Sequence, residues 1–492
     1  MASAQRQRRS MPKVRTGCAT CKSRRVKCDE ARPSCKRCTS TGRVCPGYRS
    51  DTRLQPKINN EIKIYSIPFK VPGSKADREL LHFYCCEASE SLSRFSDTTL
   101  WTHLVLQQSQ HQPVIRNALV ALSSLYRDYL QVGSQQLKMS PQHIQLIARS
   151  HRQLSTHLVF QDASPETALI CSIIFYAFEC LVGNTQQAIW HLNQGLALLQ
   201  RLGNNVPSVQ ADFDGINRQL RTVFMRLDIH ASLFIMERAP VLDLVSPEQL
   251  AGQAHVVPEH FTSISDAEET LLALQSWTLR HLYFYIGFKG VPQDRLPPHA
   301  LSERLRIKSE LRRLEIAITD FATGVNAHSL TPVQRQQLTL IEIQARTFYG
   351  VVLENLILYT DSEVASRFNL AIDQITQVLS TSGKEDDSGL HRDFTLSSNI
   401  IALLYFVCMK THDRRVLNRA LSLMQGHLAS ARDGLWDSRM AVTIIKAVQE
   451  KSVQDDGPQM AISLEYVGDR IVDADGGLDG AFQMLQISEQ SC

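Results

Sequence analysis

The sequence predicts a mainly α-helical protein, in which a small metal-stabilised domain at the N-terminus is followed by a large all-α body. Three observations support this fold class. Six of the 12 cysteines lie within the first 45 residues at a repeated spacing, apolar residues recur at helical spacings from about residue 77 to 450, and no alternation of strands with helices is visible. A chain of 492 residues is too long for one hydrophobic core, so two or three units are expected.

The charge is divided unevenly along the chain. Residues 1–50 contain 14 Lys and Arg against 2 acids, a net charge of +12, whereas the whole chain carries +4. A basic head on an acidic body indicates a polyanionic partner for the head alone. The N-terminus has no apolar segment of a secretory signal, and the apolar runs near 168–178 and 400–409 are shorter than a bilayer requires. We therefore expect an intracellular protein, with no membrane partner and few disulfides.

The N-terminal cysteines form an internal duplication. The pattern C-x2-C-x6-C occurs twice, with the second copy 17 residues after the first. Six thiolates give two metal ions four ligands each only if two sulfurs are shared, and all-sulfur tetrahedral sites suit zinc. Because the segment contains almost no apolar side chains, metal binding must supply its folding energy. The predicted ligands are Cys18, Cys21, Cys28, Cys35, Cys38 and Cys45.

Residues Gly17 to Tyr48 resemble the fungal zinc binuclear cluster DNA-binding domain. The resemblance rests on the six cysteines, the basic loop KSRRVK and Pro33 in the connecting loop. It implies two zinc ions per chain and contact with double-stranded DNA at CGG-type half-sites. A disulfide knot would need an oxidising compartment, and an iron–sulfur site would not need this symmetric sixfold spacing, so both are less expected than zinc. A zinc module that only contacts proteins stays open as an alternative.

The two halves of the duplication differ in charge. The residues between the second and third cysteine of each half are predicted to form a short helix, KSRRVK in the first half and TSTGRV, with one cation, in the second. We therefore expect the first half to face DNA. The resemblance places Arg25 at the main base-contacting position, where arginine suits a bidentate contact to guanine. Four further cations are expected to contact phosphates or bases: Lys22, Arg24, Lys27 and Arg15. The same basic runs predict import into the nucleus.

The segments around the head are assigned by composition. Residues 1–16 form a basic arm, 17–48 the zinc cluster domain, and 49–76 a linker rich in proline that lacks coiled-coil heptads. Because this common dimerisation device is missing from the linker, either the helical body forms a homodimer or the head binds DNA as a monomer.

The body, residues 77–450, shows strong helical patterns, such as PVIRNALVALSSLYRDYL from Pro113 and ETALICSIIFYAFECLVG ending at Gly183. These segments, with LLYFVCMK and DGLWDS, resemble the fungal-specific transcription factor domain, which implies a regulatory role, a small-molecule inducer and no catalysis. No catalytic spacing is visible, so an enzyme is not expected. Trp190 and Trp436 are predicted to lie in the core, and Cys85 with Cys86 to be a half-buried packing pair.

The C-terminal tail, residues 451–492, is acidic and contains interspersed apolar residues. Such a tail is typical of a segment that contacts the transcription machinery. The complete prediction is a nuclear, sequence-specific regulator of RNA polymerase II transcription. It is expected to act as an activator and to control a metabolic or secondary-metabolite gene cluster. A repressor, or an adaptor that does not bind DNA, is the alternative. The pathway and the inducer are not readable from the residues.

Overall fold

A computed structural model of the chain describes residues 17–48 and 72–454. The description omits the stretches 94–98, 132–136, 160–163, 205–213, 236–237, 289–294, 325–329, 357–360, 383–393 and residue 397. The chain divides into two compact units, Met1–Ser66 and Ile67–Cys492. The basic arm, most of the linker and the acidic tail from residue 455 lie outside the described residues, and so does Arg15.

The head contains two short helices, α1 (Ala19–Ser23) and α2 (Lys36–Thr39). Each begins directly after the first cysteine of its triplet, so the second cysteine lies within the helix. Cys18 caps α1, because its Sγ accepts a hydrogen bond from the Cys21 amide at 3.4 Å. Within the described head, the buried side chains are the cysteines, with Tyr48 packed against them.

The first layer of the body begins at a helix start with strong capping. Ser74 and Asp77 form a capping box at the N-terminus of α3, in which each side chain accepts a hydrogen bond from the other residue's amide. The elements of this layer are short, and η1 and η2 are single π-helical turns. They are α3 (Lys75–Phe83), η1 (Tyr84–Ala88), α4 (Ser89–Leu92), η2 (Leu100–Leu104) and α5 (Val105–His111).

Four longer helices follow, α6 (Pro113–Gln131), α7 (Pro141–Val159), α8 (Pro165–Val182) and α9 (Thr185–Asn204). The predicted helix at Pro113 and the predicted end at Gly183 are confirmed, with Gly183 in the left-handed conformation (φ 88°) that favours glycine. α8 is long and apolar enough to cross a membrane, but 78% of that window is buried inside the body. It packs against α6 and α9, so it is a central core helix.

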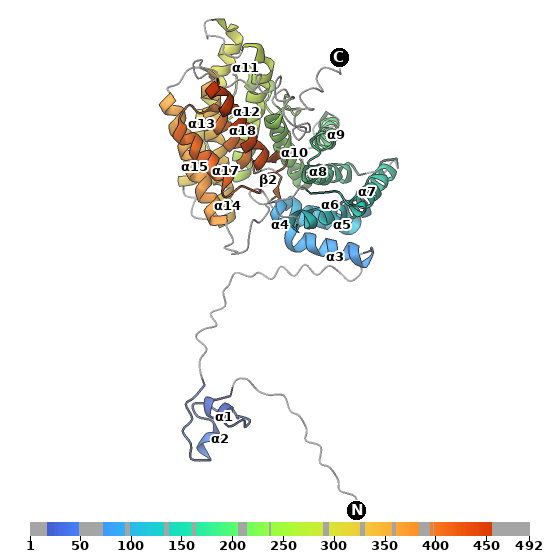
Figure 1. Cartoon of the computed structure of the whole chain (residues 1–492), viewed down its shortest axis with the longest axis vertical. Helices are drawn as coiled ribbons and strands as arrows, with labels where there is room; N and C mark the ends of the chain where they lie inside the picture. The colour runs from blue at the N-terminus through green and yellow to red at the C-terminus, as the bar shows by residue number, and fades with distance from the viewer. Residues whose placement is uncertain are drawn as a thin grey trace, which may run out of the picture. The chain divides into compact units, whose positions relative to one another are not determined.

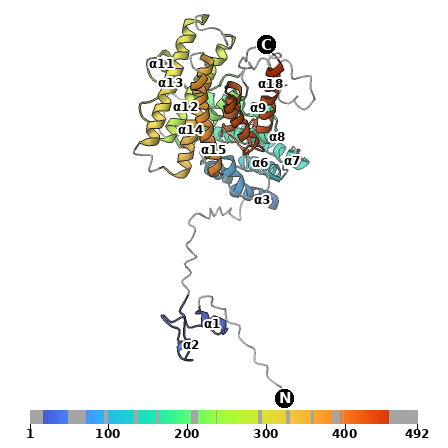
Figure 2. The same ribbon diagram turned by 60° about the vertical axis from the view of Figure 1, so that its left-hand side comes forward.

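The second part of the body is also helical. Figure 1 shows α7, α8 and α9 on one side of the body and α13 and α15 on the other, and Figure 2 shows the same separation after rotation. The elements are α10 (Asp214–Phe234), α11 (Pro247–Ala251), α12 (Ile264–Phe284), η3 (Ile286–Phe288), α13 (Pro298–Thr323), α14 (Pro332–Leu356), α15 (Asp361–Ser382), α16 (Ile400–Lys410), α17 (Arg414–Gln425) and α18 (Ser438–Gln454).

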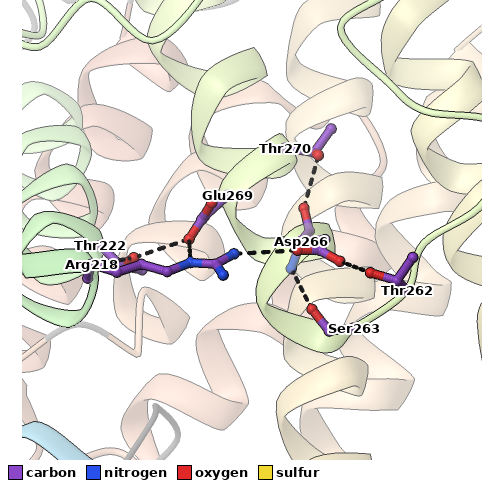
Figure 3. A network of polar contacts seen from close by, with 7 residues as sticks. All are labelled: Arg218, Thr222, Thr262, Ser263, Asp266, Glu269 and Thr270. Carbon is purple, nitrogen blue, oxygen red and sulfur yellow. Dashed lines mark hydrogen bonds and ion pairs between the residues drawn. The ribbon is translucent and has the colours of Figure 1, made fainter. Parts of the chain in front are cut away.

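A polar network joins α10 to the start of α12 (Figure 3). Arg218 lies between two acids: its Nε donates to Glu269 Oε1 at 2.9 Å and its Nη2 donates to Asp266 Oδ1 at 3.3 Å. Ser263 caps α12 by accepting from the Asp266 amide at 3.1 Å, and Thr262 donates to the Asp266 carboxylate. These contacts fix the angle at which α12 leaves the preceding loop.

Among the described residues of the body, three two-residue strands occur: β1 (Phe394–Thr395), β2 (Arg432–Asp433) and β3 (Trp436–Asp437). β2 pairs with β1 in parallel and with β3 antiparallel. The Asp433 carboxylate accepts hydrogen bonds from Thr395 Oγ1 at 2.9 Å and from Ser398 Oγ at 2.8 Å. The DGLWDS motif therefore forms a buried turn that ties together distant parts of a mainly α-helical chain.

Candidate metal centre and nucleic-acid interface

The structure brings the six predicted cysteine ligands together. Four Sγ–Sγ distances join the two halves: Cys18 lies 3.7 Å from both Cys35 and Cys38, and Cys21 lies 3.7 Å from Cys35 and 3.9 Å from Cys38. Five of the six cysteines are buried, and Cys45 is partly buried. Thiols that lie 14 to 20 residues apart in sequence thus form one compact sulfur cluster.

The cluster resolves into two overlapping groups of four. Within each group the sulfurs lie within 4.8 Å of one another, and Cys18 and Cys35 belong to both groups. The groups are Cys18, Cys21, Cys28 and Cys35, and Cys18, Cys35, Cys38 and Cys45. The arrangement matches the count of two metal ions that share two sulfurs. The shared residues are the first cysteine of each repeated triplet.

The chemistry of the donor set fits zinc. Burial raises the pKa of the Cys21 thiol to about 12, because a thiolate in a crowded, desolvated site is unfavourable without a cation. Zinc has no geometric preference against a tetrahedral set of sulfurs and keeps such thiols deprotonated. The six cysteines are therefore suited to hold zinc, which would supply a rigid centre in place of a hydrophobic core.

The predicted DNA-contacting cations lie around the end of α1, and the helix is shorter than predicted there. It spans Ala19–Ser23, so Arg25 and Lys27 follow the helix rather than lie on it. The physical reason is that Cys18 starts the helix as its cap, and the chain must then turn to return Cys28 to the cluster. Lys22, Arg25 and Lys27 are exposed, and Arg24 is half-buried.

Arg25 occupies a strained backbone position. Its φ is 53°, in the left-handed region where glycine is favoured and other residues are disfavoured by about 1–2 kcal/mol. Its amide donates to the Lys22 carbonyl at 3.1 Å, and the next amide, of Val26, donates to the Cys21 carbonyl at 3.1 Å. This hydrogen-bonded turn ends α1 and holds the exposed Arg25 side chain at its tip.

Two residues of the head were not singled out by the sequence. Asp29 accepts hydrogen bonds from the first two amides of α2, from Lys36 at 3.0 Å and from Arg37 at 3.2 Å. Tyr48 donates to the Ala31 carbonyl at 2.9 Å. The signal for Asp29 was its rarity, because it is one of only two acids in the first 50 residues.

The body places several polar side chains in defined contacts. The Nε2 atom of the fully buried His230 lies 3.9 Å from Asp433 Oδ2, and His281 Nδ1 lies 2.8 Å from Glu303 Oε2.

The two tryptophans predicted to lie in the core differ in their burial. Trp436 is buried as predicted, whereas the prediction for Trp190 is wrong, because its side chain is 52% exposed. Buried Ala188, Leu192 and Leu196 define the inner stripe of α9. Trp190 is two residues from both Ala188 and Leu192, which places it on the opposite side of the helix, so its side chain faces outward.

Two further features of the described body are a cysteine pair and a surface groove. Cys86 is exposed and Cys85 half-buried, so only the latter fits the predicted packing role. An open groove of about 550 Å³ lies between α13, α14 and α15. Its arginines are already paired with acids on the helices, Arg367 with Glu315 at 2.6 Å and Arg346 with Glu342 at 2.7 Å. The described groove is thus a charged surface feature of helix packing.

Comparison with known proteins identifies two regions of similarity. A model of the fungal specific transcription factor domain matches residues 79–341, and a model of the fungal Zn(2)-Cys(6) binuclear cluster domain matches residues 16–55. The first match covers more than half of the chain. No solved structure matches the chain significantly.

Curated relatives are transcription regulators. The aspercryptin biosynthesis cluster-specific transcription regulator atnN of Emericella nidulans is 26% identical over 329 residues, which are 60% of this chain and 52% of the relative. The transcription regulator lscL of Purpureocillium lilacinum is 29% identical over 206 residues, 36% and 46% of the two chains. The transcriptional regulatory protein moc3 of Schizosaccharomyces pombe is 56% identical over 73 residues, 13% and 14%. The chain thus spans about half the length of the first two relatives.

Proposed function

Because the chain belongs to the family defined by the fungal specific transcription factor domain, with a binuclear cluster domain at its N-terminus, we propose that it is a nuclear, sequence-specific regulator of RNA polymerase II transcription. The observation that carries the proposal is the pair of sulfur quartets that share Cys18 and Cys35. A site this regular, in a segment with a charge of +12, supports metal-dependent binding to a polyanion.

Two zinc ions per chain would be held by the six cysteines. The first quartet would bind one ion and the second quartet the other, with Cys18 and Cys35 as shared ligands. Bound zinc supplies folding energy and fixes the positions of α1 and α2, and it takes no part in a reaction. The hydrogen-bonded turn that ends α1 then positions the cations that follow the helix.

The proposed target is a CGG-type half-site in double-stranded DNA. Arg25 is exposed at the tip of the turn after α1, where its guanidinium can donate two hydrogen bonds to guanine O6 and N7. Lys22 and Lys27 are exposed on either side and are assigned to phosphates. Arg24 is assigned to the boundary between the halves, since its Nη1 lies 3.5 Å from Thr41 Oγ1. Arg15 would extend the phosphate contacts.

The remaining assignments concern the rest of the chain. The helical body would respond to a small-molecule inducer or form a homodimer, and the acidic tail 451–492 would contact the transcription machinery, which makes an activator the preferred form. The relative named as the aspercryptin biosynthesis cluster-specific transcription regulator supports control of a secondary-metabolite gene cluster. A repressor would differ only in what the tail recruits.

The test is in vitro selection of DNA sites by the full chain, with and without a zinc chelator, at stated salt concentrations. The expected result is enrichment of CGG-containing duplexes only in the presence of zinc. Paired CGG triplets would indicate a dimer, and single triplets a monomer. If no sequence is enriched although zinc is bound, the head is not a DNA-binding module, and the adaptor alternative replaces the proposal.

A further inference from the structure

Asp29 connects the two halves of the sulfur cluster. In sequence it belongs to the first half, directly after Cys28, but its carboxylate lies at the start of α2 in the second half. Its Oδ2 accepts from the Lys36 amide at 3.0 Å and its Oδ1 accepts from the Arg37 amide at 3.2 Å. The helix's own N-cap residue, Cys35, makes no side-chain capping bond. The cap of α2 is therefore supplied by a residue outside the helix.

The duplication does not repeat this arrangement. The position 17 residues after Asp29 is Pro46, which has no carboxylate, and α1 has no acid in its first turn. α1 is capped instead by the sulfur of Cys18. The cysteine ligands thus repeat with near-symmetry, whereas the acidic cap occurs in one half only.

The fold also relocates a negative charge. The two acids of the first 50 residues are adjacent, at Asp29 and Glu30, and the sequence alone would assign both to the first half. The structure places the Asp29 carboxylate against the backbone of two cationic residues of α2, Lys36 and Arg37, whose side chains are exposed. Because the carboxylate lies at the backbone of these two residues, its charge opposes the attraction of their cations for phosphate.

We propose that Asp29 is a positioning residue that restricts DNA contact to the first half of the cluster. This inference rests on the proposed function. The carboxylate acts in two separable ways: its oxygens hold α2 against the loop that leaves the first half, and its charge offsets Lys36 and Arg37. The second half is thereby a support for the cluster and does not compete for the DNA backbone.

Three substitutions in the full chain separate these two actions. Asp29→Asn removes the charge and keeps one of the two accepting oxygens, so one of the two capping bonds remains. Asp29→Ala removes both. Glu30→Gln is the matched control, because it removes the same charge from the adjacent residue. Each protein is titrated with a CGG-containing duplex and with a scrambled duplex between 50 and 300 mM salt, and its zinc content is measured against increasing chelator.

For Asp29→Asn we expect zinc loss at a chelator concentration between those for the wild type and Asp29→Ala, because one capping bond remains. We also expect about threefold tighter binding to the scrambled duplex, with a salt slope steeper by about 0.9, the value for one additional phosphate contact. The ratio of specific to non-specific affinity should fall about threefold. Glu30→Gln should change both affinities equally and leave the ratio as in the wild type. Asp29→Ala should in addition lose zinc at about fivefold lower chelator concentration, since a missing cap weakens the fold.

Each arm has an outcome that overturns its part of the proposal. If Asp29→Asn leaves the affinity ratio as Glu30→Gln does, the charge has no directing role. If Asp29→Ala retains zinc as the wild type does, the cap does not hold the second half. If the wild-type chain binds neither duplex, the proposed function itself fails together with the directing role, and the zinc measurement still decides whether the cap matters.

Discussion

The guanidinium of Arg432 donates a hydrogen bond of 2.5 Å from Nη1 to the backbone carbonyl of Cys180, a residue 252 positions earlier in the chain. This contact joins β2 to the last turn of α8. The same side chain pairs with Asp437 at 3.2 Å through Nη2, so it also bridges to β3. One arginine thus adds a second donor to a carbonyl in the last turn of α8, which also accepts from the Gly183 amide at 3.2 Å, and fixes the small sheet to the core helix.

Loss of this arginine should destabilise the body without affecting the head. Arg432→Met removes a charged donor from the Cys180 carbonyl and leaves the Asp437 carboxylate without its ion pair, which should lower the free energy of unfolding by about 2–3 kcal/mol. Circular dichroism during thermal unfolding measures the loss, and zinc content should stay unchanged. Arg414→Met, at an exposed position of α17, is the control and should have little effect. A wild-type melting temperature for Arg432→Met would contradict the bridging role.

Chelation of zinc should abolish DNA binding and leave the body folded. The buried cysteines with Tyr48 form one core cluster, and the helices of the body form another that contains none of the metal-binding cysteines. Because α1 and α2 are short, the helical signal in circular dichroism should change by only a few per cent, about their share of the helix. Band-shift titration with and without added zinc checks the binding. Cys28→Ser should behave as the chelated protein does, and Cys408→Ser, within the body, should bind DNA normally.

Arg25 should show opposite effects on stability and specificity. Arg25→Gly relieves a left-handed conformation that disfavours other residues by about 1 kcal/mol, so the head should retain zinc at equal or higher chelator concentration. The same change removes the base contact and should reduce discrimination for the CGG site by about tenfold or more. Arg25→Ala should lose discrimination without the gain in zinc retention. Equal zinc retention by the Gly and Ala variants would contradict the strain argument.

The stability of the body should fall as the pH rises through the range near 5 to 7. Burial raises the pKa of Glu179, in the last turn of α8, to about 7 from an ordinary value near 4.5. Between these values the folded state binds more protons than the unfolded state, so the free energy of unfolding decreases with increasing pH. Glu179→Gln should remove this slope and add about 1 kcal/mol at pH 8, a figure reduced for the partial exposure of the side chain. Melting temperatures at pH 5, 6.5 and 8 test this. An equal effect of the substitution at pH 5 and pH 8 would contradict it.

Gly195 lies where α9 packs tightly against α8 and α10. A Cβ at this position would lie 2.6 Å from Ser172 Oγ of α8 and would also collide with the ring of Phe224 on α10. Gly195→Ala should therefore lower the free energy of unfolding by about 2 kcal/mol or more. Gly287→Ala is the matched control, because nothing lies within 4 Å of the added methyl group. Urea unfolding of both variants compares their free energies of unfolding. Equal values would show that the helices move to accommodate the methyl group with little loss of stability.

Much of the fold was predictable because its signals are local. The stripe that starts at Pro113 and the left-handed glycine at Gly183 follow from spacing and backbone sterics, and both elements occur where predicted. The helix after Cys21 was placed too far along the chain, because the capping role of Cys18 outweighed the composition of the loop. Trp190 was assigned to the core by residue type, whereas its place around α9 sends it outward.

The meeting of six thiols in a basic N-terminal domain and the all-α body after it follow from local patterns, because repeated spacing and helical periodicity act over a few residues. Three other relationships depend on tertiary packing: Cys18 and Cys35 belong to both quartets, the Asp29 carboxylate lies on α2, and Arg432 bridges to α8. These relationships join residues that are distant in sequence or lie in different elements. They depend on how the chain packs as a whole, which no local pattern encodes.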